Sequence, residues 1–393
     1  MRRLRALAVL GLLAALAACA TTPAPRPRAL QPSRPPPPGA PPIAQMSPPI
    51  SWVDLPGWAE EDHLAAMSAL TAACAATRDA TMAKVCNTAR AAPPADEAQA
   101  RAFLETNLRP EPIAGDGLLT AYFSPEYEAR KSPEPSFTAP VRSRPGALDI
   151  LIAGALGAAA ADPSPLDSPP PVDPIDLQPD RAAINALPAS DAEAWMRPED
   201  LFFMQIQGSG VLILPDGRRM KAVFAGSNGK PFVGLARVMR AQGLIDDAGS
   251  SGEAIRAWLA AHRGPQAEAV MDQDPRYVFF RLKPDDGGEP AGAAGVALPA
   301  GRALAMDSSL HGFGELYWID GEAPALSGAF PRYRRMAAAL DVGGAIKGEV
   351  RADLYMGTGE AAGREAGRVR HTLKLYRLLP RGDFEPDTLA ADR

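Results

Sequence analysis

Residues 339–359 read ALDVGGAIKGEVRADLYMGTG, and this stretch places Asp341 and Asp353 in short strand-like runs that glycine-rich turns follow. The same alternation of short strands with glycine-rich turns extends over residues 277–379. It predicts a mainly β, barrel-like fold with attached helices. The glycines of the stretch do not match the dinucleotide-binding fingerprint, which disfavours a nucleotide-dependent enzyme.

Further strands and helices are expected upstream of this region. Pro215-Asp216-Gly217 is a strong turn signal between strands at residues 211–214 and 219–224, so these two strands should form a hairpin. The other expected elements are strands at 118–123, 202–207 and 277–282, and helices at 63–75, 82–91, 232–242 and 252–263.

The N-terminus carries an export signal. Residues 1–18 combine an arginine cluster with an apolar run that is too short to span a bilayer, and we interpret them as a signal peptide. Leu16-Ala17-Ala18-Cys19 resembles a bacterial lipobox, which implies cleavage before Cys19 and acylation of its thiol. The alternative is an ordinary secretory signal. Because Ala20 rather than an aspartate follows, we expect a lipid anchor on the periplasmic face of the outer membrane.

Composition limits the partners and marks two stretches outside the folded core. Removal of residues 1–18 takes away three arginines and changes the formal charge from −5 to −8, so nucleic acid is not expected as a partner. Many of the 42 prolines fall in residues 19–50 and 143–177. We interpret the first stretch as a lipidated tether and the second as a disordered insertion.

Cys74 and Cys86 are the cysteines that remain after the lipobox, and they lie twelve residues apart. Because the export signal indicates an oxidising compartment, we expect a disulfide between the two helices that carry them. Two buried thiols are the alternative. A zinc site is not expected, since the four histidines show no ligand spacing.

Six motifs occur in the order of one known family, and together they resemble membrane-bound lytic murein transglycosylase A with its three-aspartate domain. The motifs are Thr120-Ala121-Tyr122-Phe123-Ser124-Pro125, Gln205-Ile206-Gln207-Gly208-Ser209-Gly210, Ala225-Gly226-Ser227-Asn228-Gly229, Ala305-Met306-Asp307-Ser308-Ser309, residues 339–348 and residues 353–359. The resemblance implies a double-psi β-barrel domain built from residues 51–124 and 285–393, a second β-rich domain inserted at 125–284, and a groove between them.

The resemblance also implies an activity and roles for particular residues. It indicates a lytic exotransglycosylase that cleaves the β-1,4 bond between N-acetylmuramic acid and N-acetylglucosamine in peptidoglycan, leaves a 1,6-anhydromuramic end, and needs no metal or organic cofactor. Asp353 matches the catalytic carboxyl, which would act first as acid and then as base. Asp341 and Asp307 match its companions, with a structural role as the alternative. The residues expected to contact substrate are Thr120, Tyr122, Gln207, Gly208 and Lys347.

Other readings of these residues stay open. Strand and turn packing could explain the groove residues, and Lys347 could pair with an acid. A hydrolytic muramidase would need a second carboxylate opposite Asp353. A wall-binding lipoprotein without activity could share the barrel. Besides peptidoglycan, the cell-wall synthesis machinery is a candidate partner. Ser209 lacks the surroundings of a nucleophile, and residues 226–230 do not form a phosphate-binding loop.

Overall fold

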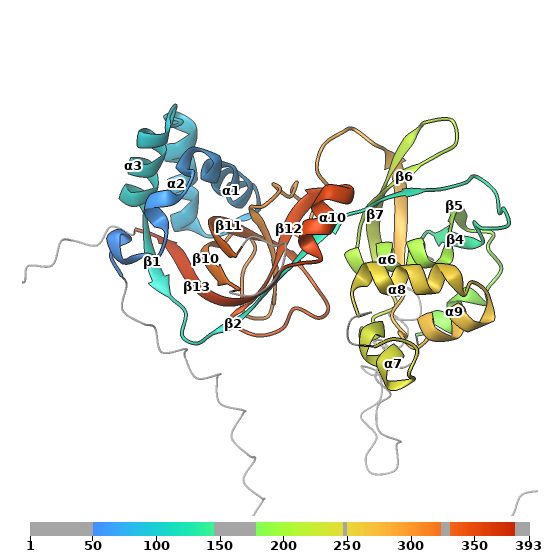
Figure 1. Cartoon of the computed structure of the whole chain (residues 1–393). Helices are drawn as coiled ribbons and strands as arrows, with labels where there is room; N and C mark the ends of the chain where they lie inside the picture. The colour runs from blue at the N-terminus through green and yellow to red at the C-terminus, as the bar shows by residue number, and fades with distance from the viewer. Residues whose placement is uncertain (1–49, 145–177, 247–249, 324–330, 382–393) are drawn as a thin grey trace, which may run out of the picture. The chain divides into compact units, whose positions relative to one another are not determined.

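The structure, a computed structural model, describes residues 50–144, 178–246, 250–323 and 331–381 (Figure 1). The signal peptide, Cys19, nearly all of the tether and most of the 143–177 insertion lie outside these residues. Within the described parts of the chain, no helix has the length and apolar character needed to cross a membrane.

The largest sheet closes on itself. Its strands are β2 (Gly117–Ser124), β9 (Ala303–Met306), β10 (Leu316–Glu322), β11 (Arg332–Val342), β12 (Arg351–Thr358) and β13 (Arg370–Pro380). They follow the order β13-β10-β11-β9-β12-β2, and β2 pairs with β13 again, which makes a barrel. Two pairs, β2 with β12 and β9 with β11, are parallel. The predicted barrel-containing, mainly β fold class is confirmed.

Side chains of strand β10 point alternately into the barrel and toward the helices that cover it. Tyr317 and Ile319 belong to one core cluster together with Leu354, whereas Leu316 and Trp318 belong to a second cluster shared with the N-terminal helices. Successive residues of a strand point to opposite faces, so this one strand contributes to both cores. Strand β1 (Leu108–Pro112) extends the sheet by pairing with β13.

A second set of elements lies in the chain between β2 and β9. A four-stranded sheet has the order β3-β6-β7-β8, and β4 pairs with β5. The strands are β3 (Glu126–Glu128), β4 (Ala139–Arg142), β5 (Ala192–Met196), β6 (Gly210–Ile213), β7 (Arg219–Ser227) and β8 (Val278–Pro284), and the helices are α5 (Arg181–Asn185), α6 (Pro198–Gln207), α7 (Leu235–Ala241), α8 (Gly252–Ala261) and α9 (Pro265–Met271). The predicted hairpin is confirmed as β6 and β7, which pair antiparallel.

The predicted strand at residues 202–207 is wrong, because these residues belong to helix α6. Pro198 stands at the start of the helix, where its missing N–H costs nothing, and Gly208 ends it with φ 83°. Glu199 and Asp200 lie in the first turn and pair with arginines that follow in the chain. These helix signals outweigh the β propensity of Phe-Phe-Met-Gln-Ile-Gln.

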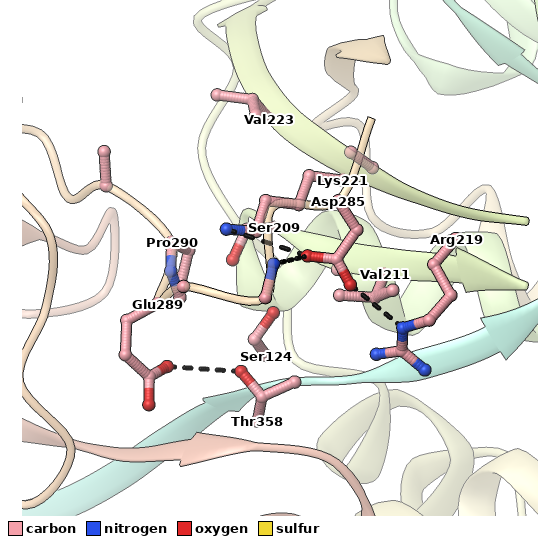
Figure 2. A pocket seen from close by; sticks show the side chains of 15 residues that line it. Ser124, Ser209, Val211, Arg219, Lys221, Val223, Asp285, Glu289, Pro290 and Thr358 are labelled. Atoms are coloured by element: carbon pink, nitrogen blue, oxygen red, sulfur yellow. Dashed lines mark hydrogen bonds and ion pairs between the residues drawn. The ribbon is translucent and has the colours of Figure 1, made fainter. Parts of the chain in front are cut away.

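A cavity of about 180 Å³ lies where the chain passes between the two sheets, as Figure 2 shows. Its lining comes from the ends of β2 and β12, from residues 209–211, from β7 and from the segment after β8. On one side, the Arg219 Nε donates to Asp285 at 2.9 Å. On the other side, the Thr358 hydroxyl donates to Glu289 at 3.3 Å.

Helices at the N-terminal side cover one side of the barrel (Figure 1). They are α1 (His63–Ala76), α2 (Ala80–Ala91) and α3 (Glu97–Asn107), preceded by the short 3-10 turns η1 (Trp52–Asp54) and η2 (Trp58–Glu60). A disulfide joins Cys74 of α1 to Cys86 of α2, as the sequence predicts.

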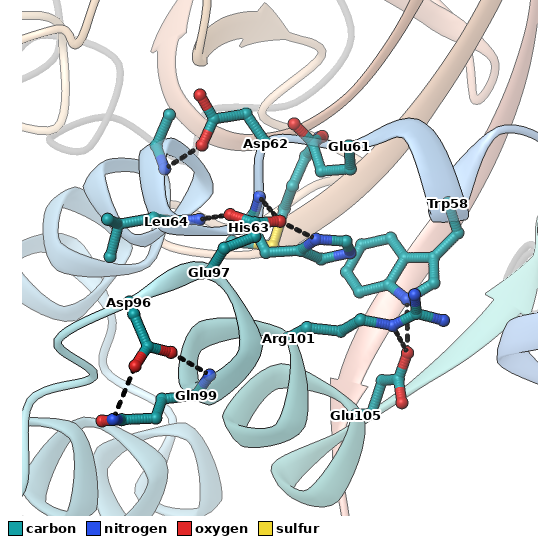
Figure 3. Close-up of polar contacts among 12 residues, drawn as sticks. Trp58, Glu61, Asp62, His63, Leu64, Asp96, Glu97, Gln99, Arg101 and Glu105 are labelled. Carbon is teal, nitrogen blue, oxygen red and sulfur yellow. Dashed lines mark hydrogen bonds and ion pairs between the residues drawn. The ribbon is translucent and has the colours of Figure 1, made fainter.

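Polar contacts fix the start of α1 (Figure 3). The Glu97 carboxylate accepts the backbone N–H groups of His63 and Leu64, each at 2.9 Å, and it also contacts the His63 ring. A helix leaves its first N–H groups without partners, so a carboxylate from α3 satisfies two of them. The Trp58 ring packs edge-on against Trp318 of β10, with 5.3 Å between centroids, and this contact attaches the helices to the barrel.

Candidate functional site

Strands β2 and β12 lie side by side in parallel and bring two of the expected groove residues, Thr120 and Tyr122, next to the strand that carries Asp353. Their register places Asp353 opposite Thr120, Tyr355 opposite Tyr122, and Thr358 opposite Ser124. Side chains two residues apart on a strand share a face, so Thr120 and Tyr122 form a row with Asp353 and Tyr355 on the β2 and β12 ladder. The register shifts between Tyr355 and Thr358, where this row ends. The Tyr122 and Tyr355 rings lie 5.3 Å apart within this row.

Asp353 is half-buried at one end of the row. The Thr120 hydroxyl donates a hydrogen bond to its Oδ1 atom. Burial raises the pKa of the Asp353 carboxyl, and the negative charge of Asp341 acts in the same direction. The hydrogen bond from Thr120 and the positive charge of Arg351 oppose this rise. The net effect favours a protonated acid, which can donate a proton.

Asp341 is engaged by three donors. Its Oδ1 accepts the N–H groups of Ala293 and Val342 at 2.9 Å each, and its Oδ2 accepts the Tyr122 hydroxyl at 2.8 Å. Burial raises the pKa of the Asp341 carboxyl, although these hydrogen bonds act against the rise. Asp341 therefore connects the row, through Tyr122, to the loop after β8.

Asp307 lies in different surroundings, directly after β9. It accepts hydrogen bonds from the Ser309 hydroxyl at 2.8 Å and from the Gly348 N–H at 3.1 Å, and Lys347 Nζ lies 3.3 Å away. The Ser309 hydroxyl is the largest cause that holds the pKa of Asp307 well below its usual range, and the Gly348 N–H adds to it. Asp307 thus stays ionised and ties two turns together. Lys347, expected at the substrate, contacts this aspartate.

The remaining groove candidates lie where α6 meets β2. Gln207 is the last residue of α6, and its Oε1 accepts the Phe123 N–H at 3.2 Å. Gly208 has φ 83°, a conformation that side chains other than glycine rarely adopt, while a Cβ there would meet open space. The backbone turn, and not crowding, therefore explains this glycine.

Three further residues at the site were not among the sequence-based candidates. Arg351 donates to Thr120 Oγ1 at 2.9 Å, and the Tyr355 hydroxyl donates to Glu289 at 2.6 Å. Arg351 and Tyr355 lie two residues before and after Asp353 on one strand, and that spacing alone predicts a shared face. Glu289 follows β8 in a glycine-rich loop, and no sequence pattern marks it.

Metal ligands do not gather in this region. Over the described residues, no group of three or more histidine, cysteine, aspartate or glutamate side chains is arranged to hold an ion. The site therefore consists of one half-buried carboxyl, a second carboxyl bound by three donors, hydroxyl groups and an arginine. This set can donate, accept and direct a proton.

Two family descriptions match this chain. One, described as "MltA specific insert domain", covers residues 118–281, and the other, described as "3D domain", covers residues 302–379. The first contains the second set of elements, and the second runs through the barrel strands that carry the three aspartates.

Relatives with known names agree with these matches. Membrane-bound lytic murein transglycosylase A of Vibrio cholerae is 30% identical over 275 residues, which cover 67% of this chain and 66% of that protein. The Escherichia coli K12 protein of the same name is 34% identical over 184 residues, which cover 46% of this chain and 49% of that protein. A crystal structure of membrane-bound lytic murein transglycosylase from Agrobacterium tumefaciens is 32% identical, has a TM-score of 0.68, and covers 85% of this chain and 97% of that one.

Proposed function

The chain belongs to the membrane-bound lytic murein transglycosylase A family of peptidoglycan-cleaving enzymes, and we propose that it cleaves the β-1,4 bond between N-acetylmuramic acid and N-acetylglucosamine without water. The observation that carries the proposal is the Asp353 carboxyl, whose pKa burial raises and which lies in the row on β2 and β12. Cell-wall turnover and remodelling is the process that such cleavage serves.

The first step is protonation of the leaving oxygen. Protonated Asp353 donates its proton to the glycosidic oxygen, and the bond between that oxygen and C1 of the muramic acid breaks. Positive charge develops at C1 and its ring oxygen, as in other glycosidic cleavages. Asp353 is left as a carboxylate, and the positive charge of Arg351 favours this ionised form.

The second step closes a ring within the sugar. The C6 hydroxyl of the same muramic acid attacks C1, and the Asp353 carboxylate accepts the hydroxyl proton, which restores the acid. The product is a 1,6-anhydromuramic end, and no water is consumed. Because nucleophile and electrophile belong to one sugar, proximity supplies much of the rate advantage.

The surroundings of Asp341 support this one-carboxyl mechanism over a hydrolytic one. A hydrolase needs a second carboxylate that is free to activate a water molecule. Asp341 is the carboxyl that interacts with Asp353, but both of its oxygens already accept hydrogen bonds. It is better suited to hold Tyr122 and the loop at Ala293 than to bind water.

The location stays a prediction from the sequence. We propose that acylated Cys19 anchors the enzyme to the periplasmic face of the outer membrane, where peptidoglycan lies within reach of the proline-rich tether. The names of the relatives describe them as membrane-bound, which agrees with this location.

The test is Asp353→Asn, which keeps the shape of the side chain and removes the proton donor. Release of 1,6-anhydromuropeptides from purified sacculi, measured by mass spectrometry, should fall more than about a thousandfold, because one residue supplies both proton transfers. Binding to sacculi in a pelleting assay should persist. Asp216→Asn, in the exposed turn between β6 and β7, is the matched control and should keep wild-type turnover. Near-normal turnover by Asp353→Asn, or products heavier by one water, would refute the mechanism.

A further inference from the structure

We propose that Arg351 is a positioning residue that acts through the Thr120 hydroxyl to determine which oxygen of Asp353 carries the catalytic proton. The inference deepens the proposed function and rests on it. It assigns a role to Arg351, which the motifs do not include, and it changes the role of Thr120 from a substrate contact to a link between Arg351 and Asp353.

The hydrogen bonds of this chain run from Arg351 through Thr120 to Asp353. A guanidinium group has donors and no acceptor, so Arg351 Nη2 must donate to Thr120 Oγ1, at 2.9 Å. The Thr120 hydroxyl has a single proton, and with Arg351 occupying a lone pair of its oxygen, that proton is directed to Asp353 Oδ1. Thr120 therefore acts as a donor to Asp353.

This direction assigns the two oxygens of Asp353 different tasks. Oδ1 accepts a hydrogen bond and is the unprotonated oxygen of the neutral acid. The proton of that acid consequently belongs on Oδ2. Among the described residues, no group forms a hydrogen bond with Oδ2, and this oxygen is not fully buried. Oδ2 is thus the oxygen that can reach a glycosidic oxygen.

Arg351 is itself held in place. Its Nη1 donates to two backbone carbonyls, that of Ala352 at 2.6 Å and that of Leu118 at 3.3 Å. The guanidinium therefore bridges β12 and β2 and cannot turn away from Thr120 without losing these bonds. A planar group with several fixed donors suits this task better than the flexible ammonium of lysine.

The position of the hydroxyl between the two groups suits both steps of the reaction. A direct ion pair with Arg351 would hold Asp353 ionised and remove the acid. Because the Thr120 hydroxyl lies between the two groups, the positive charge of Arg351 only partly offsets the rise in the pKa of Asp353 that burial and the negative charge of Asp341 cause. The neighbouring strands add two further ionisable groups and one apolar residue around this carboxyl. Tyr122 of β2 donates to Asp341, and Arg370 of β13 lies opposite Thr120. On β9, Ala305 lies opposite Asp353.

Two variants test the link from either side. Thr120→Val keeps the shape and removes the hydroxyl, and Arg351→Met removes the charge and the donors. Each should lower kcat on soluble glycan strands by roughly 10- to 100-fold, with KM within about twofold, because a hydrogen bond to a charged group is lost while the groove stays intact. Each should also shift the alkaline limb of kcat/KM to higher pH, since both groups lower the pKa of Asp353.

Rescue and control variants separate positioning from folding. Thr120→Ser restores the hydroxyl and should recover activity to within about threefold of wild type, and Arg351→Lys should be intermediate. Arg370→Met is the matched control, because it removes a charge opposite Thr120 on the neighbouring strand without removing a donor to Thr120. It should keep kcat and leave the alkaline limb near its wild-type position.

A direct titration makes the inference independent of turnover. The ¹³C carboxyl signal of Asp353, assigned with Asp353→Asn, should titrate at higher pH in Thr120→Val and in Arg351→Met than in wild type. Unchanged titration and unchanged kcat in these variants would overturn the inference, as would a fall in kcat that only follows a lower Tm. If wild type releases no anhydro product, the proposed function fails, whereas the titration still decides whether Arg351 acts on Asp353 through Thr120.

Discussion

Replacing Asp341 by two different residues separates its structural role from its charge. Asp341→Leu leaves three donors without an acceptor. The N–H groups of Ala293 and Val342 lie at exposed residues, so water can replace their acceptor at a cost of a few tenths of a kcal/mol. The Tyr122 hydroxyl is more deeply buried, so losing its hydrogen bond to Asp341 should lower the free energy of unfolding by about 1–3 kcal/mol. The Tm should therefore fall by roughly 2 to 6 °C.

Asp341→Asn should behave differently, because the amide can keep all three contacts. Its oxygen can accept both N–H groups, and its NH₂ group can donate to the Tyr122 oxygen. The Tm should stay within about 2 °C of wild type. The loss of negative charge should lower the pKa of Asp353, because the charge of Asp341 raises it. The alkaline limb of kcat/KM should then move to lower pH, the opposite of the shift in Arg351→Met.

The two measurements are thermal unfolding followed by circular dichroism at pH 7, and release of anhydro products from soluble strands between pH 4 and about 8. A well-folded Asp341→Asn enzyme that is inactive at every pH would refute the reasoning and give Asp341 a chemical role. An alkaline limb that moves to higher pH would refute the electrostatic part alone.

Two further predictions concern stability. Reduction of the disulfide between Cys74 and Cys86, which lie twelve positions apart, should cost about 3 kcal/mol by the chain-entropy relation. The double variant Cys74→Ala/Cys86→Ala without reductant should match reduced wild type in Tm. Equal Tm values for oxidised and reduced wild type would contradict this. The pKa of Asp307 is depressed in the folded state, so its contribution to stability is complete above its unfolded value near 4 and is lost as the pH falls below that value. The variant Asp307→Asn should therefore show a smaller fall of Tm between pH 5 and about 3 than wild type. An equal fall of Tm in both proteins would contradict the assignment.

Elements that depend on a few neighbouring residues, such as hairpins and helix ends, can be predicted from the sequence. The β6 and β7 hairpin follows from Pro215-Asp216-Gly217, whose glycine has φ 79°, and the Cys74–Cys86 pair follows from export and spacing. For α6, the apolar run at 202–207 is ambiguous on its own, and the deciding features are Pro198 at its start and Gly208 at its end. Together with these two residues, the run is typical of a helix.

The site is harder to predict because strand pairing creates it. The resemblance to a known family supplied Asp353 and Thr120, but no local pattern shows that residues 233 positions apart share a hydrogen bond. The contact between Arg351 and Thr120 can be recognised only when the parallel register of β12 and β2 is known. For Lys347 the sequence left two roles open, a substrate contact and a pair with an acid, and the structure shows the pair with Asp307.

The pairing of early strands with late ones also governs the order in which this chain can fold. During synthesis, β2 appears long before β12 and β13, which are its two neighbours in the barrel. The strands β3, β6, β7 and β8 find all their partners within residues 126–284, so that sheet can form without the C-terminal strands of the barrel. High contact order slows the closure of the barrel and makes it the last event. Since Thr120 meets Asp353 only when β2 pairs with β12, we expect a chain truncated before β12 to lack activity.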